Sequence, residues 1–294
     1  MLPERWGDVA ERDKTHPWLT RLDGSLTTYE ALLAQADPSI VQQLTRVAWQ
    51  RQFAAIQEAY GKLLETFHAA TPDVALVMGD DEGEWFQPAA TPRLAVYRGA
   101  TWTWGPYRST STERVYPVAV ELVDHAVQHL QKAGYAVEAF EAPVDGKRMP
   151  HAFGLQYDRL LKDPIPMVPI MVNVHFPPTQ PSIAEQYRLG QELRRAVESW
   201  QGQQQVAVVA NGGLSIGVLR ADMDRRLLDA LRRRDVPALE ALPCKWIQGP
   251  CGEMFNWIGA AGALEGLEMR VWDYVPVYRT PAGTGCGNAF VTWS

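Results

Sequence analysis

The sequence predicts an α/β fold: a single domain with a mostly parallel central sheet, flanked by helices and joined by long ordered loops. Short apolar runs alternate with helical patterns along the chain, which is typical of a parallel sheet with crossover helices. The clearest run, VAVVA at 206–210, ends in Asn211-Gly212-Gly213, the kind of turn that follows a buried strand. We find no linker or repeat, and therefore expect one domain over residues 1–294.

Each expected element rests on its own pattern. Apolar residues at three- and four-residue spacing predict helices, and β-branched apolar runs predict strands. Residues 1–38 are expected to be irregular, 87–117 to be a long loop with one edge strand, and the final strand to be followed by a glycine-rich tail at 282–290. The expected helices cover 38–70, 117–134, 183–200 and 222–234, with another beginning near Glu253, and the expected strands cover 74–78, 135–142, 168–174, 206–210 and 269–277.

Composition excludes several classes of function. The net charge is −6 and no lysine-rich run is present, which argues against a nucleic-acid surface. The chain has no apolar run long enough to span a membrane, and its first residues lack the apolar core of a signal peptide. Three cysteines without CxxC spacing indicate free thiols in a reducing compartment, so we expect a cytoplasmic protein.

The loop GDDEGEW at 79–85 follows a buried strand and carries four carboxylates, at Asp80, Asp81, Glu82 and Glu84. Clustered carboxylates repel one another and usually need a cation, a basic partner or water. The loop is therefore either a metal or acid–base site or a solvated acidic turn, and the residues alone leave both open.

Two histidines are candidates for proton transfer. His151, in PHAFG, is expected in a loop, and His175, in NVHFPP, follows a strand and is equally well placed. His125 and His129 lie four apart on a helix, a spacing that can bind metal. Because that helix is amphipathic, we expect these two side chains to face solvent instead.

Glu253 lies after two glycines at an expected helix start. The helix dipole favours an acidic side chain at this position, so helix capping alone would explain a glutamate here. The functional alternative is a metal ligand. The small residues at 259–263 allow close helix packing, and the tail AGTGCG lacks the spacing of a nucleotide-binding loop.

Several motifs together resemble a known family. PHAFG at 150–154, PIPMVPIMVNVHFPPTQP at 164–181, VAVVANGGLSI at 206–216, GEMFNWIGAAGAL at 252–264 and YVPVYRTPAGTGCGNAF at 274–290 are similar to the class III extradiol ring-cleavage dioxygenases. The branch that these motifs resemble most is that of the protocatechuate 4,5-dioxygenase beta subunit and 3-O-methylgallate dioxygenase. The N-terminal segment and the GDDEGEWF loop also fit this branch.

The resemblance implies an Fe(II) site of two histidines and a glutamate, with open positions for a catechol and O2. The glutamate ligand corresponds to Glu253, a second ligand to Glu82, and a histidine near the substrate to His151, as a catalytic residue. The family's proton-shuttling histidine corresponds to Ile216, which cannot accept a proton. The remaining ligand belongs to a Ser-His-x-Pro segment just upstream of the position of Leu2, so we expect that segment to be absent.

We further expect His175 and Asp81 to contact the substrate. Three functions remain open. The chain is a divergent or catalytically silent subunit that associates with an active homologous subunit, an active Fe(II) dioxygenase with an altered metal site, or an enzyme that performs a different reaction with His151 and the acidic loop. In each case the expected ligand is a small aromatic substrate of the catecholic or gallate type, and the expected assembly is a homo- or hetero-oligomer.

Overall fold

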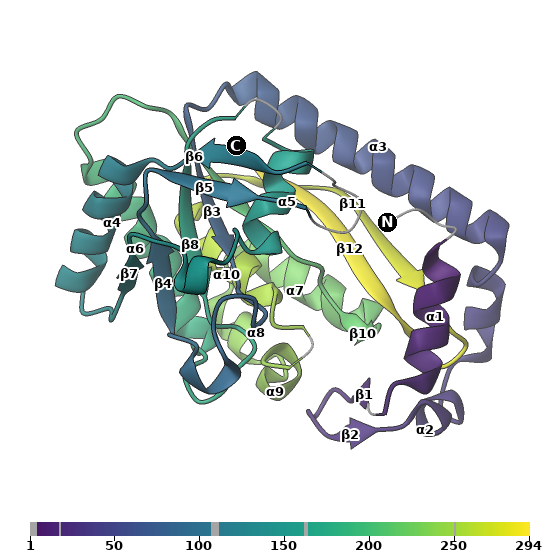
Figure 1. Ribbon diagram of the computed structural model, residues 1–294. Coiled ribbons are helices and arrows are strands. Elements are labelled where there is room, and N and C mark those ends of the chain that lie inside the picture. Colours follow the sequence, from purple (N-terminus) through teal and green to yellow (C-terminus); the bar gives the residue numbers. More distant parts are fainter. Residues whose placement is uncertain (1–4, 18, 107–111, 162–163, 250) are drawn as a thin grey trace. The chain divides into compact units, whose positions relative to one another are not determined.

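The computed structural model describes residues 5–17, 19–106, 112–161, 164–249 and 251–294 (Figure 1). The chain forms two compact units. The first contains the chain up to Thr66 together with 213–254 and 267–294, and the second contains 67–212 and 255–266. One domain over 1–294 stays a prediction. The position of Leu2, beside which the resemblance places a missing ligand segment, lies outside the described residues.

The second unit is built on a five-stranded sheet of order β7-β4-β8-β3-β9. β3 pairs in parallel with both β8 and β9, and β4 pairs in parallel with β7. Only β4 and β8 are antiparallel, so the sheet is mostly parallel, as predicted. Its strands are β3 (Val74–Gly79), β4 (Leu94–Tyr97), β7 (Glu138–Phe140), β8 (Met167–Val172) and β9 (Val206–Ala210).

The segment 87–117 contains more structure than a loop with one edge strand. It begins with a short 3-10 helix, η3 (Pro88–Ala90), and continues into β4, which lies between β7 and β8 and is therefore not an edge. It ends in a two-stranded ribbon of β5 (Thr101–Trp104) and β6 (Arg114–Pro117). The alternating apolar residues of TWTW bury Trp102 and Trp104 on one side of β5.

Helices cover both faces of the sheet. At the end of β3, a side chain on Gly79 would meet Phe153 of α5, whereas Met78 contacts Gly259 of α10. Because consecutive strand residues point to opposite faces, α5 and α10 lie on opposite sides. The helices of this unit are α4 (Val120–Lys132), α5 (His151–Arg159), α6 (Ile183–Ser199) and α10 (Met254–Ala263), with the short η4 (Val144–Gly146) before α5.

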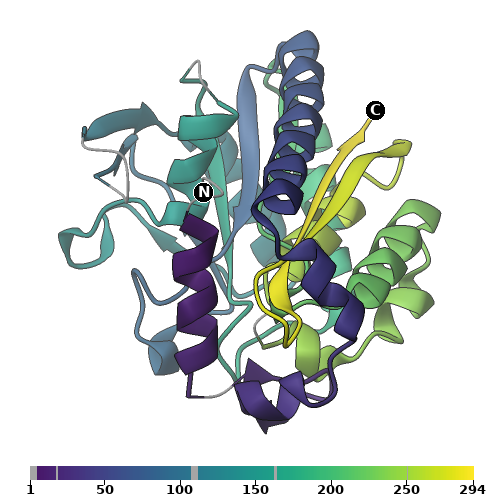
Figure 2. The ribbon, with the colours of Figure 1, turned by 90° about the vertical axis from the view of Figure 1, so that its right-hand side faces the viewer.

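The first unit contains an antiparallel sheet of order β10-β12-β11, in which β11 (Met269–Tyr278) and β12 (Thr284–Trp293) form a long hairpin. Figures 1 and 2 show the hairpin beside α3 (Arg46–Ala70), whose Trp49 and Gln52 side chains donate hydrogen bonds to backbone oxygens of β11. The other elements are α1 (Trp6–Thr15), β1 (Leu19–Thr20), β2 (Leu26–Thr27), α2 (Tyr29–Leu33), η2 (Pro38–Gln43), β10 (Ile216–Val218), α7 (Ala221–Arg233), α8 (Val236–Glu240) and α9 (Cys244–Ile247).

Two local expectations are corrected. Residues 1–38 are not irregular throughout, since α1 and α2 form there. The glycine-rich tail at 282–290 forms most of β12, where glycine lets the strand approach neighbouring groups closely. His151 is the first residue of a helix instead of a loop residue, because Pro150 precedes it at the N-cap, where the missing N–H costs nothing. None of the described helices is long and apolar enough to cross a membrane.

Candidate metal centre

The acidic loop leaves the carboxyl end of β3 in a tight turn. Glu82 and Gly83 both have left-handed backbone conformations, with φ of 49° and 80°. The buried carboxylate of Asp81 closes the turn by accepting hydrogen bonds from the backbone N–H groups of Trp85, at 2.7 Å, and Phe86, at 3.0 Å. Burial raises the pKa of Asp81, although these hydrogen bonds oppose the rise. Asp81 therefore builds the loop, and its predicted contact with substrate stays a prediction.

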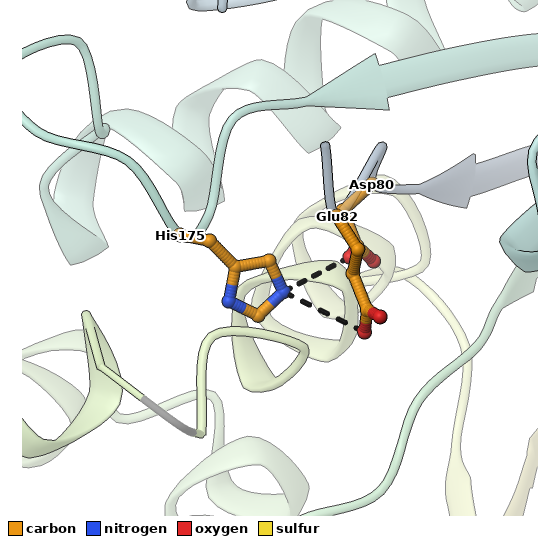
Figure 3. Close-up of side chains that lie close together, drawn as sticks. All are labelled: Asp80, Glu82 and His175. Carbon is orange, nitrogen blue, oxygen red and sulfur yellow. Dashed lines mark hydrogen bonds and ion pairs between the residues drawn. The ribbon is translucent and has the colours of Figure 1, made fainter. Parts of the chain in front are cut away.

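His175 reaches the same edge of the sheet from β8, the parallel neighbour of β3. The side-chain oxygen of Asn173 accepts hydrogen bonds from the N–H groups of His175, at 3.3 Å, and Phe176, at 2.9 Å, and so fixes the turn after the strand. His175 Nε2 then lies 3.0 Å from Asp80 Oδ2 and 3.8 Å from Glu82 Oε1 (Figure 3). Parallel strand ends thus bring the loop and the histidine together.

Asp80, Glu82 and His175 fit a divalent metal ion. Their ligand atoms all lie within 4.8 Å of one another, and among the residues that the structure describes no other group of this kind meets that criterion. Ligands of one ion at about 2.0–2.2 Å lie within roughly 4.4 Å of each other, so the group needs only small side-chain movements. The Asp80 side chain is 2% exposed. One imidazole and two carboxylates suit Fe(II) or Mn(II).

His151 lies beside this group at the start of α5. Glu84 Oε2 accepts a hydrogen bond from the His151 backbone N–H at 2.9 Å and lies 2.8 Å from Nδ1. A carboxylate acceptor at Nδ1 leaves Nε2 directed elsewhere, and Nε2 lies 3.7 Å from Glu82 Oε2. Glu82 therefore lies between the two histidines, with one oxygen toward each.

The charges around His151 make its imidazole a stronger base. Burial lowers the pKa of the imidazole, but the hydrogen bond that the ring donates to Glu84 and the negative charges of Glu84, Glu82 and Asp80 outweigh burial and raise the pKa above its ordinary value. An imidazole held by a carboxylate in this way is arranged for proton transfer.

The remaining predicted residues lie in the first unit. Glu253 Oε2 accepts a hydrogen bond from the Gly213 N–H at 2.6 Å, and so holds the turn before β10. Its role as a metal ligand stays a prediction. Ile216 begins β10 and pairs with Cys286 of β12, so an aliphatic side chain occupies the position that the resemblance gives to a histidine.

His125 and His129 are not simply exposed. Both are partly buried on α4 and face α6, where His125 Nε2 lies 3.0 Å from Ser199 Oγ and His129 Nε2 lies 2.9 Å from Glu192 Oε2. Their spacing therefore serves helix packing.

The individual roles of Asp80 and Glu84 were not predicted. Both belong to the acidic loop, but the residue pattern does not say which carboxylate faces which histidine. The one usable signal is that 79–85 and His175 both follow strands of a parallel sheet, whose carboxyl ends share an edge.

An α/β sheet with carboxylates and histidines gathered at its carboxyl edge defines the chain as a candidate metalloenzyme. The model of the family described as the catalytic LigB subunit of aromatic ring-opening dioxygenase matches residues 48–285. The chain belongs to this family, which confirms the resemblance to the class III extradiol dioxygenases.

One solved structure, an uncharacterized protein (JW3007) from Escherichia coli K12, is 14% identical and has a TM-score of 0.50. The match covers 76% of this chain and 90% of the Escherichia coli chain. At 14% identity, this likeness shows a similar fold and nothing about function. A sequence comparison with curated proteins finds no match.

Proposed function

We propose that this chain is an active, metal-dependent ring-opening dioxygenase for a catecholic aromatic acid, with Asp80, Glu82 and His175 as the metal ligands. The convergence of these three ligand groups at one sheet edge, with His151 across Glu82, carries the proposal. His175 is thereby a ligand instead of the substrate contact predicted from sequence. The substrate class comes from the likeness to the protocatechuate and methylgallate branch.

Fe(II) bound there would supply open coordination positions for the substrate and O2. The protein residues have separate tasks. Glu84 Oε2 accepts a hydrogen bond from the backbone N–H of His151 and contacts Nδ1 of its ring, so that Nε2 faces Glu82 of the metal group. His151 is then the base that takes the proton of a catechol hydroxyl. General acid–base help of this kind is worth about 10²–10⁴-fold in rate. Since Ile216 has no proton to exchange, the task falls to His151.

A catalytically silent subunit is the second candidate. Two observations favour it: Ile216 occupies the proton-shuttle position, and the metal group offers one imidazole where the family uses two. On this alternative the chain forms an oligomer with an active homologous subunit. For either candidate, the free Cys244, Cys251 and Cys286 fit a cytoplasmic protein.

The test is oxygen uptake and ring-opened product with protocatechuate and gallate, after anaerobic loading of the purified protein with Fe(II). We expect turnover that falls at least 100-fold in His151→Ala and is lost in His175→Ala. His125→Ala, which changes a histidine outside the site, is the matched control. Full iron binding without turnover by the protein alone, and turnover only with a homologous subunit, would favour the silent subunit. Turnover of an aromatic substrate without metal would favour a different reaction.

A further inference from the structure

We propose that Asn256 is a positioning residue that fixes the orientation of the Asp80 carboxylate in the metal group. This inference rests on the proposed function, because it assigns a role toward the metal that Asp80 would bind. Asn256 lies near the start of α10 and is fully buried. Its Nδ2 donates a hydrogen bond to Asp80 Oδ1 at 3.0 Å, while the other oxygen, Oδ2, lies 3.0 Å from His175. One carboxylate oxygen is thus occupied and the other directed into the group.

The amide of Asn256 can take only one orientation here. Three oxygens surround its Nδ2: Asp80 Oδ1 and, at 3.4 Å each, the backbone and side-chain oxygens of Asn211. A flipped amide would bring its own oxygen against all three, with no donor among them. The orientation of the donor is therefore set by the acceptors around it.

Asn211 supports this orientation from the turn after β9. Its Nδ2 donates a hydrogen bond to the backbone oxygen of Ala152, which leaves its Oδ1 toward Asn256. Ala152 follows His151 on α5. A single chain of hydrogen bonds therefore connects the helix that begins at His151 with the Asp80 carboxylate.

The arrangement is not the one that core packing alone would favour. Asn256 Oδ1 is buried and has no hydrogen-bond partner, which costs stability. A leucine of similar shape would remove that oxygen. It would also leave Asp80 Oδ1 without its donor, so the amide serves the carboxylate and not the packing around it.

A hydrogen-bond partner of a ligating carboxylate typically changes metal affinity by about 10–100-fold when it is removed. Mn²⁺ binding to the full-length protein, measured by titration calorimetry and by the EPR spectrum of the bound ion, tests the inference. We expect Asn256→Leu to weaken Mn²⁺ binding about 10–100-fold and to change the EPR spectrum. Asn211→Ala should weaken it by less, because the donor remains but loses its support.

Gln186→Met is the matched control. Gln186 is a fully buried amide on α6 whose side-chain atoms have no hydrogen-bond partner, and a side chain on Gly259 of α10 would meet it. Wild-type Mn²⁺ affinity and a wild-type EPR spectrum in this variant would show that replacing a buried amide in the same core does not by itself weaken metal binding. Equal losses in Gln186→Met and Asn256→Leu would overturn the inference.

The outcomes separate this inference from the proposed function. A wild-type protein that binds no Mn²⁺ or Fe²⁺ overturns the metal site itself. A wild-type protein that binds Mn²⁺, with Asn256→Leu binding equally well, overturns only the role of Asn256. If Asn256→Leu does not fold, the Asn211→Ala variant provides the test. A loss of about threefold or more in Mn²⁺ affinity supports the inference, and wild-type Mn²⁺ affinity overturns it.

Discussion

Replacing Gly190 with alanine should destabilise the second unit, because this glycine lets α6 and α10 touch through their backbones. A methyl group at Gly190 would lie 2.7 Å from the backbone nitrogen of Ala263, 2.9 Å from the carbonyl carbon of Gly259, and closer still to the Gly259 oxygen. These are backbone atoms, and carbon contacts need about 3.5 Å or more. The helices must therefore separate by roughly 1 Å.

The size of the effect follows from two opposing contributions. Overpacking of a well-packed core costs about 1–3 kcal/mol. Alanine recovers about 0.5–1 kcal/mol of helix propensity relative to glycine. We expect Gly190→Ala to lose a net of up to about 2.5 kcal/mol of unfolding free energy. Gly61→Ala, in α3, is the matched control: no atom lies within 4 Å of the new methyl group, so it should gain about 0.5–1 kcal/mol.

Urea unfolding followed by circular dichroism measures both variants. Opposite signs in Gly190→Ala and Gly61→Ala support the reasoning. A Gly190→Ala protein at least as stable as wild type would refute the close contact of α6 with α10.

Two further predictions concern ionisable groups. Glu84→Gln should lower the pKa of His151, because burial remains while the main counter-charge is lost. In metal-free wild-type protein, the protonated imidazole of His151 stabilises the fold below pH about 6.5. This contribution is lost as the pH rises through the raised pKa of His151. Glu84→Gln should remove this contribution to stability. Burial raises the pKa of the Cys286 thiol to about 12 and that of Cys251 further still, whereas Cys244 is exposed. A disulfide-exchange reagent should therefore titrate Cys244 first in native protein, the partly buried Cys286 more slowly because of its raised pKa, and Cys251 only after denaturation.

NMR titration of the histidine ring signals checks the first of these, with Glu198→Gln as the control. Glu198 pairs with Arg194 on the surface of α6, and its loss should leave the pKa of His151 unchanged. An unchanged pKa of His151 in Glu84→Gln would refute the role of that carboxylate. For the thiols, rapid reaction of three groups in the native protein would contradict the burial.

The sequence predicts the sheet well because buried parallel strands have a strong local signature. VAVVA and VALVM each appear as strands at the expected residues, and the helix at 183–200 ends within one residue of its expected boundary. The tail at 282–290 gives no such signature, because its glycines allow close contacts with residues distant in the sequence. A side chain on Gly285, for example, would meet the backbone of Val277. Local patterns cannot reveal a requirement set by a partner strand.

The site was predictable only in part for a similar reason. Glu82, His151 and His175 were each identified from their positions near strands, but their grouping depends on how β3, β8 and α5 meet. Glu84 belongs to the acidic loop, but the residue pattern does not show that it holds His151. Asn256, which holds Asp80, shows no local signal. Asn256 lies in a helix of small and aromatic residues, where an asparagine alone indicates nothing.

Anomalous X-ray diffraction from crystals of the protein soaked with Mn²⁺ would locate the proposed metal site directly. We expect one strong peak at the carboxyl end of β3, within about 2.0–2.4 Å of ligand atoms from Asp80, Glu82 and His175. That result would establish a metal site with a single imidazole. No peak at this position, or a bound ion whose ligands exclude His175, would contradict the account.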